Sequence, residues 1–531
     1  MSTNDVILLQ VKAFVISVVL LSCSLLVFSQ KKKEMPESNY ISQPNRIEFD
    51  LLDTDVEYTI VSGEEKGLLV VIETSTRGTD GYNWLFHFMD TTLNVKWTKL
   101  LSIDYESGFR GYDYYDGKFY LLFNKSRYKN EELIVYVFDA ETSNFGKIEI
   151  STVFPIQLSE FEVLGNSILL GGYVNMRPVM ISYDIREKKP RVLPGFYGNS
   201  NDILNLVTDD NAEVFTVVLT EQMRNKRNSI RAKTFTSDGI LVQDNMVQPG
   251  DKKNLIDGAS TMFFGGFQYI VGTYSKRSSL YSKGLYLSKF VNGRQQFIKY
   301  YGYSDLNNFF GYMKEKRESR IKARIKRKKA KGKRPNFSYQ LLVHDIIERN
   351  GTYVLIAEAY YTRYSGYASS MVPYSSGYGY NYPRNYSPGF LGYKYTHAIV
   401  VAFDQAGNII WDNSFGIDDV TTYSLDEFVN VNTYDDKIVL MYLDENEIRS
   451  KVIKENEIFE GKTINPVRLT YEYDKVKNRD PDVEGLEDWY GNTLYAFGEQ
   501  RIYNEVKESG EAYRKIFYIN KIEYHLESNP N

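Results

Sequence analysis

One short pattern, a turn followed by an alternating apolar strand, occurs eight times in this sequence and constrains the fold more than any other feature. Gly, Asn or Asp supplies the turn, and the residues after it alternate as β-strands do. The copies begin at Gly67, Gly117, Asn166, Ala212, Phe267, Thr352, Asp436 and Asn492. Successive starts lie 50, 49, 46, 55, 85, 84 and 56 residues apart. Such a period predicts a repeat architecture in which each unit packs against its neighbours.

A second pattern recurs inside these units with identical spacing. The first copy, "FHFMDTTLNVKW", contains Asp90, Asn94 and Trp97, and the second, "VVAFDQAGNIIW", contains Asp404, Asn408 and Trp411. In both copies an apolar run ends in Asp, a polar tetrapeptide follows, and Trp closes the next alternating segment. This arrangement is typical of two β-strands that are joined by a tight turn.

Each unit is long enough for four short antiparallel strands, which is the composition of a β-propeller blade. The strand–turn–strand phrase resembles the blades of WD40-like and pyrroloquinoline-quinone-like propellers, and this resemblance implies the fold alone. We therefore predict an all-β chain that forms a single propeller of about eight blades. Seven blades, or two stacked β-sandwiches, are the alternatives. The segment around Ile47 is expected to complete the last blade and close the ring.

The N-terminal residues are expected to direct export rather than to join the fold. Lys12 precedes an apolar run, Ala13–Phe28, which is shorter than the roughly 20 residues of a membrane span. We predict a signal peptide at 1–29 that is cleaved before Gln30, a flexible lead-in at 30–46, the propeller at 47–526 and a tail at 527–531. The alternative is a retained N-terminal anchor, because Lys31, Lys32 and Lys33 oppose translocation.

Several kinds of chemistry are excluded or disfavoured by residue counts. Cys23 is the only cysteine, so a chain that begins at Gln30 has no thiol for catalysis, zinc or iron–sulfur clusters. The four histidines, His87, His344, His397 and His525, have no ligand-spaced partner. Only four Trp are present, so the repeated Trp motif of quinone-binding propellers is not sustained. We therefore predict no metal site and no cofactor.

Four pairs of acidic residues lie beside Gly or Asn at the ends of expected strands: Asp113/Asp116, Asp209/Asp210, Asp418/Asp419 and Asp435/Asp436. Asp is common in such turns because its carboxylate accepts backbone hydrogen bonds. We interpret the pairs as structural and predict no catalytic residue. The alternative is a carbohydrate-active enzyme, a glycosidase or lyase, whose carboxylates come from several blades to the central channel.

Two insertions, at about 302–338 and 360–396, account for the two long intervals between copies. The first contains Lys314–Arg334, where 13 Lys and Arg face two Glu, a net charge of +11. Because the whole chain carries −4, the remainder carries −15. We expect a solvent-facing helix or frayed arm that ends at Gly332 and Pro335. Its predicted binding residues are Arg317, Arg320, Lys322, Arg324, Lys326, Arg327, Lys328 and Lys329.

The second insertion, Tyr360–Tyr395, interleaves 11 tyrosines with Gly, Ser and Pro. Such a composition cannot build a core of its own. Tyrosine provides broad amphipathic contact at a low entropic cost. The predicted contact residues are Tyr364, Tyr367, Tyr374, Tyr378, Tyr380 and Tyr382.

These features favour an exported, non-enzymatic binding or scaffold protein of a bacterial cell envelope, in the periplasm or associated with the outer membrane. The expected partner is an envelope protein or an anionic surface, either lipid headgroups or an acidic polysaccharide. Nucleic acid is not expected as a partner, and membrane association is expected to be peripheral at most. A solvated basic arm that lies on its own acidic propeller is the alternative interpretation.

Overall fold

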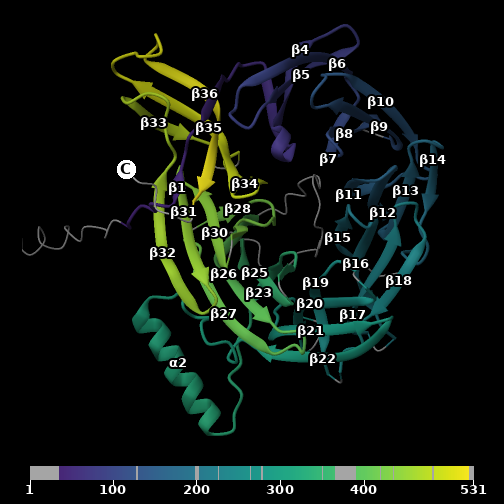
Figure 1. The fold of residues 1–531 in the computed structure, drawn as a ribbon, viewed down its shortest axis with the longest axis vertical. Coiled ribbons are helices and arrows are strands. Elements are labelled where there is room, and N and C mark those ends of the chain that lie inside the picture. The colour runs from purple at the N-terminus through teal and green to yellow at the C-terminus, as the bar shows by residue number, and fades with distance from the viewer. Residues whose placement is uncertain are drawn as a thin grey trace, which may run out of the picture.

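The computed structural model describes residues 35–525 apart from 127–128, 198–201, 225, 251, 264, 277–278, 350, 365–389, 419, 435 and 481–482. The expected signal peptide and C-terminal tail lie outside the described residues. Within them the strands form eight sheets, which succeed one another around a ring (Figure 1). The predicted eight-bladed propeller is therefore confirmed, and the seven-bladed and sandwich alternatives are wrong. No helix of this described part is long and apolar enough to cross a membrane.

Blades 1 to 4 are four-stranded antiparallel sheets whose first strand lies innermost. Blade 1 consists of β3 (Asp55–Ser62), β4 (Leu68–Arg77), β5 (Gly81–Met89) and β6 (Val95–Asp104). Blade 2 consists of β7 (Gly108–Tyr115), β8 (Lys118–Ser126), β9 (Lys129–Asp139) and β10 (Phe145–Ser151). Blade 3 consists of β11 (Gln157–Leu164), β12 (Ser167–Val174), β13 (Arg177–Asp184) and β14 (Lys189–Val192). Blade 4 consists of β15 (Ile203–Asp209), β16 (Val214–Gln222), β17 (Asn228–Thr236) and β18 (Leu241–Met246). A short 3₁₀ turn, η1 (Glu64–Lys66), joins β3 to β4.

Blades 5 to 8 follow the same plan with additions in blades 6 and 8. Blade 5 consists of β19 (Asn254–Ser260), β20 (Phe267–Ser275), β21 (Gly284–Val291) and β22 (Arg294–Gly302). Blade 6 consists of β23 (Gln340–Val343), β24 (Ile347–Arg349), β25 (Thr352–Tyr364), β26 (Phe390–Phe403), β27 (Ile409–Gly416) and β28 (Thr421–Thr422). Blade 7 consists of β29 (Asn430–Tyr434), β30 (Lys437–Asp444), β31 (Glu447–Lys454) and β32 (Glu457–Pro466). Blade 8 consists of β33 (Asp474–Arg479), β34 (Gly485–Tyr490), β35 (Thr493–Asn504) and β36 (Tyr513–Tyr524).

The N-terminal segment supplies the outer strands of blade 8. Both β1 (Ile41–Ser42) and β2 (Arg46–Asp50) pair antiparallel with β36, so the first and last parts of the chain share one sheet. The expected closure by the segment around Ile47 is thus confirmed. The prediction of a flexible lead-in up to residue 46 needs correction from Met35 onward. Ser38 is buried, and its backbone N–H donates to Asn465 of blade 7 (3.0 Å).

The core consists of apolar layers between successive blades. The described residues form eight apolar clusters, each with side chains from two neighbouring blades. The cluster between blades 8 and 1 joins Phe517 and Ile519 to Leu68 and Val70, which closes the circle. The eight strands that follow the repeated turns, from β4 to β35, lie next to the inner strands of their blades, and each of them supplies at least four buried apolar residues. The sequence repeat is therefore the repeat of the inter-blade core.

The spaced Asp/Asn/Trp pattern forms the outer hairpins of blades 1 and 6, as predicted. Asp90 accepts the backbone N–H groups of Thr92 (2.9 Å) and Asn94 (3.0 Å), which closes the turn between β5 and β6. Trp97 on β6 then donates from its indole nitrogen to the backbone oxygen of Ala140 in blade 2 (3.1 Å). The Trp of this pattern therefore joins one blade to the next.

Candidate functional site

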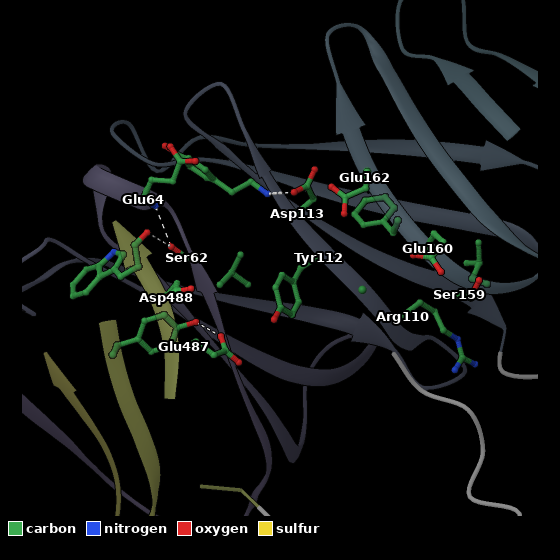
Figure 2. Close-up of a pocket in the computed structure, with 17 residues that line it drawn as sticks. Ser62, Glu64, Arg110, Tyr112, Asp113, Ser159, Glu160, Glu162, Glu487 and Asp488 are labelled. Atoms are coloured by element: carbon green, nitrogen blue, oxygen red, sulfur yellow. Dashed lines mark hydrogen bonds between the residues drawn. The ribbon is translucent and has the colours of Figure 1, made fainter. Parts of the chain in front are cut away.

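The innermost strands of blades 8, 1, 2 and 3 surround a cavity of about 430 Å³ (Figure 2). Six carboxylates line it: Glu64, Asp113, Glu160, Glu162, Glu487 and Asp488. Its aromatic lining residues are Tyr112, Tyr114, Phe161, Trp489 and Tyr495. Arg110 is the only basic residue among those that line the cavity. The cavity is therefore strongly acidic and has aromatic walls.

The local structure of β11 explains why two of these carboxylates share a wall. Glu160 and Glu162 are two residues apart, so their side chains leave the same face of the strand. A β-bulge at Ser159 interrupts the pairing of β11 with β12, and such bulges redirect the side chains that follow. Gly171 on β12 leaves the space that Glu160 occupies, because a Cβ there would lie 2.8 Å from the Glu160 side chain.

Burial raises the pKa values of Asp113, Glu160 and Glu162, so these groups keep their protons at pH values where an exposed carboxylate is ionised. Desolvation raises the pKa of Glu160 to about 7. Desolvation also raises the pKa of Glu162, and the neighbouring Asp113 and Glu160 raise it further. The pKa of Asp113 is raised by burial, although its carboxylate accepts the N–H groups of Val163 (2.6 Å) and Tyr114 (2.8 Å). Near neutral pH the cavity therefore contains both proton donors and carboxylates.

A second acidic group lies on the inner side of blades 6 and 7. His344 Nε2 contacts Glu358 Oε1 (2.7 Å), and His344 Nδ1 contacts Glu427 Oε2 (3.3 Å). Burial lowers the pKa of His344, but the hydrogen bond and charge of Glu358 outweigh it and the net shift is upward. Glu358 also accepts the N–H groups of Phe428 (2.9 Å) and Val429 (2.8 Å). These contacts fix the segment that leads into blade 7, so we interpret this group as structural.

The predicted basic residues lie on one helix, α2 (Glu315–Ala330), so the expected helix is confirmed. Gly332 has φ +66°, and the N–H groups of Gly332 and Lys333 bond to the carbonyls of Lys329 (2.9 Å) and Lys328 (3.0 Å), as in a Schellman C-cap. Ile321 and Ile325 pack against the apolar cluster of blades 5 and 6. One face of α2 is therefore attached to the ring.

The predicted cations differ in their contacts, since Lys329 reaches the ring and Lys322 pairs within α2. Lys322 pairs with Glu318 (2.6 Å), and Lys329 pairs with Asp305 (3.2 Å) and donates to the backbone oxygen of Ser304 (2.8 Å). Lys328 is half-buried. Like Lys322 and Lys329, the remaining predicted cations are exposed: Arg317, Arg320, Arg324, Lys326 and Arg327. Because α2 lies outside the ring (Figure 1), these cations and the cavity form two separate surfaces.

Of the predicted tyrosines, only Tyr364 lies among the described residues, where it ends β25. Tyr367, Tyr374, Tyr378, Tyr380 and Tyr382 lie outside the described residues. The connections from β22 to β23 and from β25 to β26 leave the same face of the ring, because strand direction alternates within a blade. The first insertion also packs on β26 just after the second insertion ends, since the Tyr312 ring stacks on His397 with ring centroids 3.7 Å apart.

The other sequence candidates occupy structural positions. His87 Nδ1 contacts the hydroxyl of Thr98 (2.8 Å), its cross-strand neighbour, as expected of a strand histidine. Burial lowers the pKa of His397 to about 3. Asp209 accepts the turn N–H groups of Asn211 and Ala212 (3.1 Å each). In the part of the chain that the structure describes, no group of three or more His, Cys, Asp or Glu is arranged to hold a metal ion.

The cavity carboxylates, apart from Asp113, were not singled out from the sequence. Asp113 was interpreted as a turn former, yet it lines the cavity. The signal that could have identified the others is the phrase "SEFEV" at Ser159–Val163, where two Glu alternate within an otherwise apolar strand. Charges at alternate positions of a strand predict one polar face, here toward the channel.

The molecule is thus an eight-bladed propeller with an acidic, aromatic-walled cavity and a basic helix on its rim. No protein-family model matches the sequence, and no curated protein matches it either. Among solved structures, the tricorn protease aligns with 80% of this chain and 36% of its own length (TM-score 0.36, 9% identity). Polysaccharide lyase Uly1 aligns with 91% of this chain and 99% of its own length (TM-score 0.38, 8% identity). The dihydro-heme d1 dehydrogenase NirN aligns with 94% of this chain and 83% of its own length (TM-score 0.38, 11% identity). This chain spans about a third of the tricorn protease chain and about half of a prolyl endopeptidase chain. Because the sequence identities are so low, the likeness to these structures concerns the fold alone.

Proposed function

We propose that this protein is an exported, non-enzymatic propeller that serves as a binding platform in a bacterial cell envelope, in the periplasm or at the outer membrane. Its main contact element is the exposed cationic face of α2, and the Tyr-rich insertion adds a second contact on sequence grounds. The observation that carries this proposal is the attachment of α2. Ile321 and Ile325 bind the helix to the ring, while seven of its eight predicted cations are exposed.

Electrostatics favour an anionic partner for such a helix. The helix and its flanks carry +11 against −15 for the remainder of the chain, so the positive potential is concentrated at one place on the rim. A helix that is already folded and attached loses little conformational entropy when it binds. Because the Debye length is about 8 Å at physiological salt, binding through exposed cations is expected to weaken strongly as salt is added.

Reversing three exposed charges on α2 tests this proposal. The triple variant Lys316→Glu, Arg320→Glu and Arg327→Glu is expected to reduce association with isolated envelope fractions at low salt by about 100-fold. The matched control is Arg186→Glu, Lys188→Glu and Lys189→Glu, three exposed cations of blade 3, which change the net charge by the same amount. If both triple variants lose association with envelope fractions equally, or if the α2 variant loses none, α2 is not the contact element.

The cavity supports a second candidate function, a carbohydrate-active enzyme with its site in the central channel. Glu160 has a pKa of about 7, which suits a general acid near neutral pH. Asp113 accepts hydrogen bonds from two backbone N–H groups, so it is better placed than Glu160 to act as the ionised carboxylate. Aromatic walls such as Tyr112 suit the faces of sugar rings. An acidic cavity repels uronic acids, so hydrolysis of a neutral or amino sugar fits it better than a lyase reaction on an anionic polymer.

Two neutral replacements separate this second candidate from the first. If the cavity hydrolyses neutral oligosaccharides, Glu160→Gln is expected to lower kcat by about 100-fold or more, because a general acid is lost. The control Glu457→Gln changes an exposed carboxylate on β32 and is expected to leave kcat unchanged. Release of reducing ends from a panel of neutral and amino-sugar polysaccharides is the measurement. Absence of any release by the unaltered protein, or equal release by Glu160→Gln, counts against the enzyme.

A further inference from the structure

We infer that the rim formed by α2, β27 and β32, here called the α2 edge, faces an anionic lipid bilayer. This inference rests on the proposed function, because it specifies the partner of α2 as lipid headgroups and adds an orientation of the whole ring. Three observations on different elements carry it: the exposed charges of α2, the place where the N-terminal chain enters the ring, and exposed apolar residues on β32.

The cations of α2 that point away from the ring form one continuous face. With 3.6 residues per turn, Lys316, Arg320 and Arg327 lie on the side of the helix opposite Ile321 and Ile325. All three cations are exposed. Basic residues near an anionic bilayer each contribute about 1 kcal/mol of attraction. A single row of cations on an attached helix can therefore approach a flat surface together.

The N-terminal chain enters the ring beside blade 7, next to the blade against which α2 lies. Two residues of β32 hold this segment. Ile464 donates its backbone N–H to the backbone oxygen of Pro36 (3.0 Å), and Asn465 accepts the backbone N–H of Ser38 (3.0 Å). Figure 1 shows this entry and α2 on the same side of the ring. The sequence before Met35 contains the apolar run Ala13–Phe28, and six residues, 29 to 34, separate the two. Six residues span at most about 20 Å, so in a chain that keeps this run as an N-terminal anchor, the alternative to cleavage before Gln30, the α2 edge is held close to the bilayer.

The outer strand of blade 7 presents apolar groups on this rim. Ile458 and Phe459 of β32 are 59% and 44% exposed. Apolar side chains beside cations strengthen binding at the headgroup boundary of a bilayer. Because β32 also carries Glu457 and Glu460, the positive charge of the edge comes from α2 and not from blade 7. The remainder of the chain, at −15, is repelled by an anionic surface, which favours one orientation.

Site-specific labelling of the chain that starts at Gln30 tests the orientation. This chain has no cysteine, so one environment-sensitive fluorophore can be placed on Ile458→Cys in blade 7 or on Val192→Cys in blade 3. Both positions lie on outer strands and are exposed, at 59% and 43%, and Figure 1 shows β32 and β14 on opposite sides of the ring. The probes are vesicles of phosphatidylglycerol mixed with phosphatidylcholine, and vesicles of phosphatidylcholine alone.

With the anionic vesicles, fluorescence is expected to rise about twofold or more at position 458 and to stay unchanged at position 192. Vesicles of phosphatidylcholine alone are expected to change neither signal. Reversing Lys316, Arg320 and Arg327 is expected to lower co-sedimentation with anionic vesicles about 100-fold, whereas the blade 3 triple variant is expected to bind as the unaltered chain does.

Three outcomes overturn the inference and are distinguishable from failure of the proposed function. Binding with equal signals at positions 458 and 192 removes the orientation but leaves α2 as a contact element. No binding to anionic vesicles, together with α2-dependent binding to envelope fractions, removes lipid as the partner and leaves the proposed function in place. Loss of α2 dependence in both assays removes both proposals.

Discussion

A chain that begins at Leu51 is expected to be less stable than one that begins at Met35 by about 5 kcal/mol, a large part of the stability of an ordinary domain. The shorter chain lacks β1 and β2, which are the outer strands of blade 8. Loss of β2 removes its antiparallel pairing with β36, which runs from Arg46 opposite Asn520 to Asp50 opposite Ile516, and leaves β36 as an open edge. An unpaired edge strand also promotes aggregation, so the shorter chain is expected to be less soluble.

The side chains of β2 explain why this loss is large. The Arg46 guanidinium, 5% exposed, donates to Glu48 (2.8 Å), Asn520 (2.8 Å) and Gln500 (3.0 Å). Ile47 and Phe49 pack on the apolar cluster between blades 8 and 1. Removing β2 therefore leaves polar partners unsatisfied in blade 8 and exposes the one interface that joins the two ends of the ring.

Denaturation followed by tryptophan fluorescence measures this effect, because Trp489 donates to the Gly67 oxygen across the interface of blades 8 and 1 (3.3 Å). A synthetic peptide of residues 35–50, added to the shorter chain, is expected to restore the midpoint in a concentration-dependent manner. The chain that begins at Met35 is the control for removal of the preceding residues. Equal midpoints for the two chains would show that the closing strand contributes little to the ring.

The fold could be predicted because its information is local and repeated. Each of the eight phrases, such as the one at Gly117, encodes the same second strand, and its apolar residues fill the layer between two blades. Repetition makes up for the weakness of each single strand signal. The closing role of the segment around Ile47 could be predicted for a similar reason, since a ring of complete blades needs one more strand than the C-terminal residues provide.

The cavity could not be predicted because its residues become neighbours only when the ring closes. Asp113, Glu160 and Asp488 come from blades 2, 3 and 8, which are far apart in the sequence. Their pKa values depend on burial by several blades, which strand alternation does not show. The basic helix was predicted because its charges are contiguous in the chain, but its attachment through Ile321 and Ile325 depends on blades 5 and 6.

The stability of the folded chain is expected to fall as the pH rises from about 4.5 to 7, partly because of Glu160. The ordinary pKa of Glu is 4.5, and in the folded chain desolvation raises that of Glu160 to about 7. In this window the folded state binds more protons than the unfolded state, so each increase in pH favours unfolding. The stabilising contribution of the protonated carboxyl is complete below pH 4.5 and is lost as the pH passes through 7.

Glu160→Gln removes the charge while it keeps the shape of the side chain. The variant is expected to be more stable than the unaltered chain by about 2 kcal/mol at pH 8, because an ionised carboxylate no longer has to be buried. At pH 4.5 the two chains are expected to agree within about 0.5 kcal/mol. Chemical denaturation at both pH values measures the difference. The control Glu457→Gln, at an exposed position of β32, is expected to change stability by less than about 0.5 kcal/mol at either pH.

A loss of stability in Glu160→Gln at pH 8 would contradict this account, because it would mean that the folded cavity stabilises the ionised carboxylate. The result also bears on the two candidate functions. In a propeller that only supports α2, a carboxylate at position 160 brings no advantage, because Gln would fill the same space without burial of a charge. A carboxylate that destabilises the ring at pH 8 and is required for hydrolysis would instead show that the cavity gives up stability for catalysis.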